Sequence, residues 1–588
     1  MQDNAMALSR RFLGLSADKR QVFLRRLQEQ GLDLSSLPIP SGMAGDASPA
    51  SFAQQRLWFI DQLEPGNSAY HLPGAIRLNG PLDVGAVQAA FDTLALRHHS
   101  LRTTFRADEN GEPLQVVGPV APVNIPQLSA DSEMAFQAWA REIAQQPFDL
   151  AAGPLWRVAL VRMAEHDHRL VLCLHHIIAD GWSIQVLLTE FAQCYRAALA
   201  GEVADLPSLP LQYADVALWQ RRGLEAGAGE VGLDYWTRQL GDEPPVLELP
   251  TDRPRPAQQS FRGGRYHFTF DDTVANALNA LARSRGTTFF TVMLAAYKVL
   301  LYRLSGQTDL SVGVPIAGRE QAELEGLIGF FVNTQVLRSD VAGGDGFTAI
   351  LSREHEIARQ AQTHQALPFE HLVDQLQPER SLSQNPLFQV LYNHQQRDGE
   401  RFELTPGVTA ELLAQDAGAA QFDLALHTWA FPDGRVGGNW NYAADLFDGE
   451  TVERIHRRFE CLLRQIAADP QQSVGDYDLL DDTDHEQLAS WNRTGVDYGR
   501  PEPVHRLFER QVAAHPDREA LVFGAERLSY ADLDARANRL AHYLIGQGVD
   551  RNSLVGVATE RSVALVVALY AIQKAGAEIR RASCRERV

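Results

Sequence analysis

The sequence has few cysteines, almost no lysine and an excess of acidic residues. Its four cysteines are scattered along 588 residues and form no CxxC pair, so neither a zinc site nor a disulfide framework is indicated. Lysine accounts for only three of the 54 basic residues, which we interpret as a base-composition habit of the gene. The formal net charge of −20 argues against nucleic acid or an anionic membrane as the main partner, since both require a basic face.

Long apolar runs are also missing. The longest apolar stretch, residues 289–304, is interrupted by Lys298 and Arg303 and is not expected to cross a bilayer. The first residues carry no apolar core of the length that a signal peptide requires. We therefore expect a soluble, cytoplasmic protein.

Three common catalytic motifs are absent as well: a Gly-x-Ser-x-Gly elbow, a Walker loop and a His-Glu-x-x-His helix. Their absence disfavours a serine hydrolase, a phosphate-loop enzyme and a metalloprotease. A histidine base without a protein nucleophile suits the transfer of an activated acyl group, in which histidine positions or deprotonates the attacking amine, hydroxyl or thiol.

The candidate site is the stretch Leu-Val-Leu-Cys-Leu-His-His-Ile-Ile-Ala-Asp-Gly-Trp-Ser-Ile at 170–184. Five apolar residues followed by a histidine pair are typical of a buried strand that delivers polar groups at its end. Side chains alternate along a strand, so we expect His175 and His176 on opposite faces, one held in the fold and one toward a ligand. Asp180 and Gly181 end the strand pattern, and the glycine lets backbone approach a ligand closely. A metal site on His175, His176 and Asp180 is disfavoured because adjacent strand residues diverge.

The length exceeds what one core supports, and we expect about three or four folded units. Two lobes of similar α/β class suggest a cleft between them, a usual place for a ligand. The leading helices are either a docking element or a cap packed on the next domain. The predicted division is 1–45 helical docking or linker segment, 46–225 first lobe, 226–480 second lobe, 481–500 linker, 501–577 start of a further domain, and 578–588 tail.

Local patterns place the main elements of these units. Apolar residues at helical spacing predict a helix at 84–97, and the Pro-rich and Gly-rich stretch 206–258 predicts a surface crossover. The other expected elements are strands at 75–78, 265–270 and 309–319 with its loop, helices at 186–198 and from Phe289, a hairpin of 520–523 with 528–530, and helices at 531–546 and 563–575.

The histidine stretch resembles the HHxxxDG signature of condensation domains of nonribosomal peptide synthetases, relatives of chloramphenicol acetyltransferase. Seven further stretches match that family in the right order, at 51–58, 97–105, 212–220, 313–319, 329–334, 364–373 and 385–388. One departure is His99, which replaces the usual glutamate of the second motif and which we interpret as a tolerated change. The resemblance implies an α/β fold of two acetyltransferase-like lobes that form a V-shaped domain.

The resemblance also implies roles for individual residues. His176 would orient or deprotonate the acceptor amine, while His175 faces the fold. Asp180 would be structural and paired with Arg319, and Gly181 would line the channel with its N–H toward developing oxyanion charge. Arg102 and Trp219 are expected to support the site. No cofactor or metal is expected on the chain itself.

The end of the chain resembles the beginning of an adenylation domain. Leu-Ser-Tyr-Ala-Asp-Leu at 528–533 resembles its first core motif, and Gln-Lys-Ala-Gly-Ala at 573–577 resembles the start of its second. The resemblance stops at 578–588, which hold four arginines and which we expect to be an artefact resembling translated adapter sequence. We therefore expect a truncated adenylation domain without adenylation activity.

The function implied by the resemblance is amide-bond formation between a carrier-bound acyl or peptidyl donor and a carrier-bound aminoacyl acceptor. The partners would be peptidyl carrier protein domains that hold both substrates on 4'-phosphopantetheine, together with an upstream synthetase subunit or acyl donor. Two alternatives are an acyl-coenzyme A-dependent acyltransferase and a noncatalytic carrier-docking platform.

Overall fold

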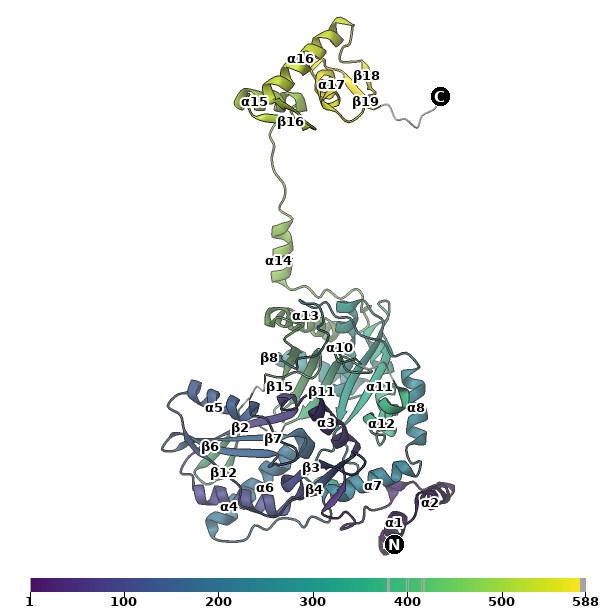
Figure 1. Ribbon diagram of the computed structural model, residues 1–588, viewed down its shortest axis with the longest axis vertical. Helices are drawn as coiled ribbons and strands as arrows, with labels where there is room; N and C mark the ends of the chain where they lie inside the picture. The colour runs from purple at the N-terminus through teal and green to yellow at the C-terminus, as the bar shows by residue number, and fades with distance from the viewer. Residues whose placement is uncertain are drawn as a thin grey trace. The chain divides into compact units, whose positions relative to one another are not determined.

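The computed structural model describes residues 2–581 except 378–380, 398, 400, 414, 416 and 417, and it divides into two compact units, Met1–His485 and Glu486–Val588. The first unit contains two lobes, each built on a six-stranded sheet (Figure 1). Both sheets are mixed, and each carries helices, so the predicted α/β class and two-lobed architecture are confirmed.

The sheet of the first lobe has the strand order β12-β13-β2-β7-β6-β5. Its central strand β7 is buried along almost its whole length because α4 and α6 cover one face of the sheet and α5 covers the other. A separate small sheet pairs β4 with β1 and β3. The bounds of these elements are β1 Ala47–Pro49, β2 His71–Asn79, α4 Val84–Arg97, β3 Thr103–Ala107, β4 Pro113–Val117, β5 Gln127–Ser129, α5 Glu133–Gln145, β6 Trp156–Ala164, β7 Asp167–His175, α6 Gly181–Ala200, β12 Arg401–Thr405 and β13 Val408–Leu413.

The sheet of the second lobe has the order β10-β9-β11-β14-β15-β8, and its helices pack on one face around the buried α10. In the described part of the chain no single helix is long and apolar enough to cross a membrane. Helices α9 and α10, which meet at a bend of 109°, reach the length and apolar composition of a membrane span only when they are taken together. The bounds are β8 Gly263–Thr269, α9 Asp272–Ser284, α10 Phe289–Ser305, β9 Asp309–Ile316, β10 Asn333–Asp340, α11 Phe347–Thr363, α12 Phe369–Leu376, β11 Val390–Gln396, β14 Leu424–Ala430, β15 Val436–Ala443 and α13 Gly449–Ala468.

The boundary between the lobes differs from the predicted cut at residue 225. The hairpin of β12 and β13 comes from the second half of the chain, yet β13 pairs antiparallel with β2, from Thr409 opposite Asn79 to Leu413 opposite Ala75. In Figure 1 β12 accordingly lies among the strands and helices of the first lobe. The sheet of the first lobe is therefore completed by the chain that builds the second.

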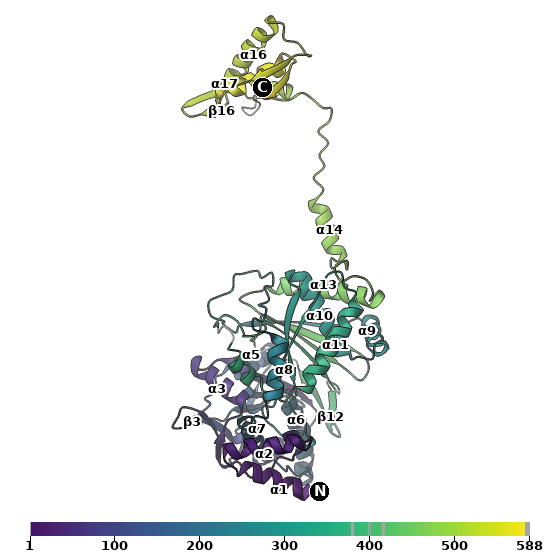
Figure 2. The ribbon, with the colours of Figure 1, turned by 90° about the vertical axis from the view of Figure 1, so that its right-hand side faces the viewer.

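The stretch 206–258 also differs from the prediction of a surface crossover. It contains helices α7, Tyr213–Glu225, and α8, Glu230–Leu240, and buries Trp219 and Trp236. The N-terminal helices α1, Gln2–Leu13, and α2, Ala17–Glu29, pack beside α7 (Figure 2), where the Phe12 and Trp219 rings lie 5.4 Å apart. The leading helices thus form a cap on the first unit, one of the two expected possibilities.

The second unit forms a small α/β arrangement of its own. The predicted hairpin and both predicted helices are present, as β16 and β17 followed by α16 and α17. Residues Glu578–Arg581, expected to lie outside the fold, form β19, which pairs in parallel with β18, and residues 582–588 of the predicted tail lie outside the described residues. The bounds are α15 Val504–Ala514, β16 Glu519–Phe523, β17 Glu526–Ser529, α16 Tyr530–Gly546, β18 Leu554–Val557 and α17 Val563–Lys574, and the predicted linker contains α14, Asp482–Trp491.

Candidate active site

The histidine pair lies at the junction between β7 and a 3₁₀ turn, His176–Ile178. The strand ends at His175, so the expected alternation of strand faces does not apply to His176, which belongs to the turn. His175 is buried, and its Nδ1 accepts a hydrogen bond from the Ile177 N–H at 3.1 Å. Burial, reinforced by the charges of His71 and His176, lowers the pKa of His175 to about 3. His175 is therefore a neutral residue that holds the turn.

The His176 ring is fixed in one tautomer by its own turn. Its Nδ1 lies 2.8 Å from the Ala179 carbonyl oxygen, which can only accept, so Nδ1 carries the proton and Nε2 keeps a lone pair. Burial lowers the pKa of His176, and the nearby charge of Asp180 only partly opposes this effect. The Phe330 ring of the second lobe packs against the imidazole with 4.7 Å between ring centroids. His176 thus presents a neutral acceptor nitrogen between the two lobes.

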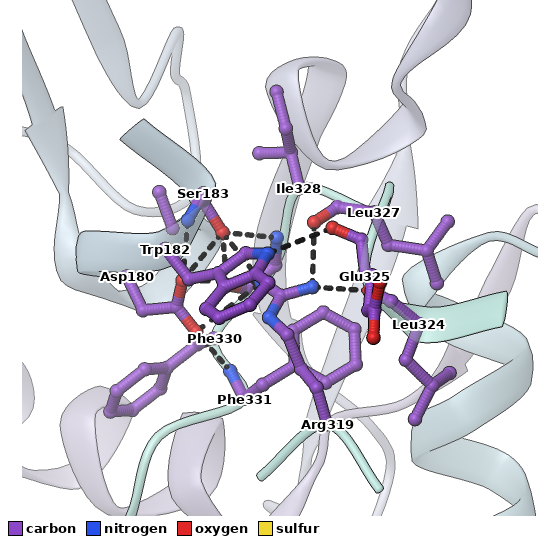
Figure 3. Close-up of polar contacts among 12 residues, drawn as sticks. Asp180, Trp182, Ser183, Arg319, Leu324, Glu325, Leu327, Ile328, Phe330 and Phe331 are labelled. Atoms are coloured by element: carbon purple, nitrogen blue, oxygen red, sulfur yellow. Dashed lines mark hydrogen bonds and ion pairs between the residues drawn. The ribbon is translucent and has the colours of Figure 1, made fainter. Parts of the chain in front are cut away.

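Asp180 caps the helix that follows the turn and is fully buried. Its Oδ1 accepts from the Ser183 N–H at 2.8 Å and from the Ser183 hydroxyl at 2.7 Å. Its Oδ2 accepts from the Phe331 N–H at 3.0 Å, and its carboxylate pairs with the Arg319 guanidinium at 3.2 Å. Figure 3 shows these contacts. Asp180 therefore joins the start of α6 in the first lobe to the second lobe, as the predicted pairing with Arg319 requires.

Arg319 connects the same helix start to the loop that precedes β10. Its Nη1 donates to the carbonyl of Leu327 at 2.8 Å and to that of Leu324, while its Nη2 donates to Asp180 and to the Ser183 hydroxyl (Figure 3). The guanidinium also lies 3.9 Å from the centre of the Phe331 ring. Burial lowers the pKa of Arg319 from its ordinary value, and the Asp180 charge counteracts this.

Residues 328–331 receive further contacts from the first lobe that the sequence did not single out. The Ser100 hydroxyl donates to the Ile328 carbonyl at 2.6 Å, and the Tyr213 hydroxyl donates to the Phe330 carbonyl at the same distance. Ser183 accepts from the Gly329 N–H at 3.1 Å. Ser100, Tyr213 and Ser183 all stand in or directly beside motifs that resemble the family, which is the only sequence signal that could have found them.

A cavity of about 70 Å³ lies beside Phe330, between the two lobes. It is lined by residues of both lobes, among them Ser51, Tyr213, Phe331 and Glu370. Arg56 of α3, Phe52–Leu63, reaches Glu370 across this boundary at 3.6 Å. This cavity therefore lies next to the ring that contacts His176.

Arg102 and Trp219, expected to support the site, lie elsewhere. Arg102 donates to the carbonyls of Ala95 and Gly118 and so ties α4 to the end of β4. Trp219 belongs to the apolar cluster beneath α1 and α2. The structure does not bring either side chain to the histidine turn.

Gly181 is the first residue of α6, where backbone N–H groups have no partner within the helix. A Cβ at this position would lie 3.7 Å from Nε2 of Gln395, which comes from β11 of the second lobe. Among the described residues, no three His, Cys, Asp or Glu side chains gather as metal ligands would. The Nδ1 atoms of His175 and His176 instead hold the turn, and the carboxylate of Asp180 holds the second lobe.

Comparison with known proteins places these features in a family. The condensation domain model matches residues 45–489, and the AMP-binding enzyme model matches residues 508–579. One of the linear gramicidin synthase proteins of Brevibacillus parabrevis is 42% identical over 576 residues, which cover 96% of this chain and 11% of that protein. Chondramide synthase cmdD of Chondromyces crocatus is 42% identical over 549 residues, which cover 92% of this chain and 14% of that protein. The chain thus spans only a small part of these relatives.

Solved structures agree with the fold. The X-domain from teicoplanin biosynthesis is 30% identical, with a TM-score of 0.70 over 75% of this chain and 100% of that chain. A four-domain nonribosomal peptide synthetase bound to AMP and glycine has a TM-score of 0.80 at 24% identity, over 92% of this chain and 42% of that chain. The expected two-lobed, acetyltransferase-like architecture is confirmed. The chain belongs to the condensation domain family, and its C-terminal part matches the AMP-binding enzyme family.

Proposed function

We propose that the condensation domain of this chain forms an amide bond between two carrier-bound substrates. The donor is an acyl or peptidyl thioester, and the acceptor is an aminoacyl thioester. Both are held on 4'-phosphopantetheine arms of peptidyl carrier protein domains, one supplied by an upstream synthetase subunit or acyl donor. Membership of the condensation domain family and the synthetase names of the relatives support this assignment.

The observation that carries the proposal is the fixed tautomer of His176. Because Nδ1 donates to the Ala179 carbonyl, the Nε2 lone pair is free to accept a hydrogen bond from the attacking α-amine. An α-amine has a pKa of about 8 and is partly neutral at pH 7, so positioning by Nε2 suffices for much of the attack. The lowered pKa of His176 keeps Nε2 unprotonated.

The reaction needs no protein nucleophile. The acceptor nitrogen attacks the donor carbonyl carbon, the carbon–nitrogen bond forms, and the carbon–sulfur bond breaks. The proton lost by the amine passes by way of His176 Nε2 to the departing pantetheine sulfur, which leaves as a thiol. The Gly181 N–H, at the first position of α6 and without a partner inside the helix, would meet the negative charge that develops on the carbonyl oxygen.

The test uses preloaded donor and acceptor carriers and mass-spectrometric detection of dipeptidyl product on the acceptor carrier. We compare the native chain with His176→Ala and with the control His166→Ala, a residue exposed on the turn between β6 and β7. We expect a loss of about a hundredfold in H176A, the usual cost of a missing acid–base or positioning group, and no loss in H166A. Equal product from H176A would contradict the role of His176. Turnover with free acyl-coenzyme A and no carrier, or carrier binding without product, would instead favour one of the two alternatives.

A further inference from the structure

The buried side chain of Gln54 reaches from the start of α3 to the histidine turn. Its Nε2 donates to the Ile177 carbonyl at 3.1 Å, and Ile177 directly follows His176. The other end of the amide is fixed as well, because its Oε1 accepts from the Ser51 N–H at 2.9 Å. A carbonyl can only accept and an N–H can only donate, so both contacts require the same orientation of the amide. Gln54 therefore holds the backbone next to His176 without adding a charge.

The same helix start is also tied to the second lobe. The Tyr213 hydroxyl lies 2.6 Å from the Phe330 carbonyl oxygen and 2.9 Å from Ser51 Oγ. Tyrosine has a single hydroxyl proton and the carbonyl can only accept, so that proton goes to Phe330 and the Ser51 hydroxyl donates to Tyr213. Ser51 Oγ in turn accepts from the Gln54 N–H at 3.1 Å. We call Gln54, Ser51 and Tyr213 the bridge, because together they connect the Ile177 carbonyl to the Phe330 carbonyl.

The bridge supports the histidine turn at a point that the ion pair of Asp180 does not reach. Asp180 anchors the backbone at the end of the turn, and Gln54 anchors it at Ile177. The Ala179 carbonyl, which fixes the tautomer of His176, lies between these two anchored residues. Loss of the contact from Gln54 would leave the turn anchored at one end only.

The other end of the bridge holds a part of the second lobe that has room to move. Ser51, Tyr213 and Phe330 all line the cavity of about 70 Å³, so packing alone does not fix the Phe330 backbone on this side. The bridge is itself buried, and a lost donor there leaves its acceptor without a partner. Removal of the Tyr213 hydroxyl should therefore let Phe330 shift toward the cavity, away from the imidazole whose ring centroid is 4.7 Å from its own.

We propose that Gln54 and Tyr213 are positioning residues for the condensation reaction, which keep His176 and Phe330 in the arrangement that the attacking amine requires. This inference rests on the proposed function. Neither residue exchanges a proton with the substrates, because Gln54 acts through the histidine turn and Tyr213 acts through Phe330. A reacting group displaced by about 1 Å can react about a hundredfold more slowly. Since the hydrogen bonds of the bridge are made to protein groups, their loss should lower kcat and leave KM for the loaded carriers unchanged.

The kinetic test measures dipeptide formation on preloaded carriers by the full chain. Gln54→Met keeps the length of the side chain but cannot donate, and Tyr213→Phe removes only the hydroxyl. We expect kcat to fall about ten- to hundredfold in each variant, with KM unchanged. The double variant Q54M/Y213F should be no slower than the slower single variant, because both changes break one bridge. Two effects that multiply in the double variant would show that the residues act independently and would overturn the bridge.

Tyr195→Phe is the matched control. Tyr195 lies near the far end of α6, is fully buried, and its hydroxyl accepts from the Asp83 N–H at 3.0 Å. Y195F should lose stability but keep the native kcat, because this bond does not reach the histidine turn. An unchanged kcat in both Q54M and Y213F, or an equal loss in Y195F, would overturn the proposal. If Q54M does not fold, Y213F against Y195F still decides.

A second measurement does not depend on turnover. Nitrogen NMR of the full chain with isotope-labelled histidine distinguishes the protonated from the unprotonated imidazole nitrogen, and H176A identifies the two signals of His176. The native chain and Y195F should show the separate signals of one fixed tautomer, whereas in Q54M the signals should move toward a common average. Unchanged signals in Q54M would overturn the role of Gln54. A native chain whose fixed tautomer is lost in Q54M, but which forms no dipeptide, would refute the proposed function while supporting the bridge.

Discussion

The carboxylate of Asp180 should stabilise the first unit mainly through its charge rather than as a helix cap, and the substitution Asp180→Asn separates the two effects. Asparagine caps helices as well as aspartate does, so the hydrogen bond to the Ser183 N–H survives. The amide nitrogen then faces the Phe331 N–H, donor against donor, and the buried Arg319 guanidinium loses its counter-charge. Removing one partner of a buried ion pair costs about 3–5 kcal/mol, which is the expected loss in unfolding free energy.

Asp83→Asn is the matched control. Asp83 caps α4 in the same lobe by accepting from the Ala86 N–H at 2.9 Å, but it is exposed. Its replacement should therefore cost no more than about 0.5 kcal/mol. Urea unfolding followed by tryptophan fluorescence suits the comparison, because eight of the nine tryptophans lie in the first unit. Equal losses in D180N and D83N would refute the argument that the charge pair between the lobes dominates.

Three further predictions concern other buried groups. Lys298 lies in the core, where its Nζ donates to Glu354 and Ser339. The variant K298M should lose about 3–5 kcal/mol of unfolding free energy in urea, whereas K298M/E354L should lie near the native value. A double variant as unstable as K298M would contradict this. Gly318 has φ +64°, and a Cβ there would lie 2.1 Å from the Phe331 carbonyl oxygen. G318A should therefore slow product formation by displacing Phe330 from His176. The control is G306A, at φ +75° with no atom within 4 Å of the added Cβ, which should cost about 1–2 kcal/mol of stability without slowing product formation. His175 has a folded pKa of about 3, below its unfolded value near 6.5, so its stabilising contribution is complete above pH 6.5 and declines as pH falls toward 3, by about 2 kcal/mol at pH 5. H175N should therefore show a shallower loss of unfolding free energy between pH 7 and pH 5 than the native chain, and parallel curves would count against a buried neutral His175.

Strong local periodicity made some elements predictable from sequence. The helix at 84–97 was predicted with its observed bounds, because its apolar residues recur at helical spacing. β2 was predicted only at 75–78, since Pro73 and Gly74 conceal the first half of a strand that begins at His71. In 206–258 the density of proline and glycine concealed two helices whose tryptophans are buried.

The candidate site was predictable to the extent that it depends on motifs. The pairing of Asp180 with Arg319 followed from family resemblance, and the structure has it. The direction of His176 could not be derived from strand alternation, because the strand ends one residue earlier and a 3₁₀ turn sets the ring. Gln395 of β11 carries no local signal, since only the packing of the two lobes brings its side chain beside Gly181.

The hairpin of β12 and β13 has a consequence for the order in which the protein assembles during synthesis. β2 pairs with β7 on one side and with β13 on the other, and β13 follows β2 by about 330 residues. At translation rates of about 5–20 residues per second, the second edge of β2 waits roughly 15–65 seconds for its partner. During that interval the nascent first lobe presents an open strand edge, a surface that can pair with another chain. A ribosome that stalls before residue 413 therefore leaves this edge uncovered, and the first lobe reaches its final form only after most of the second has been made.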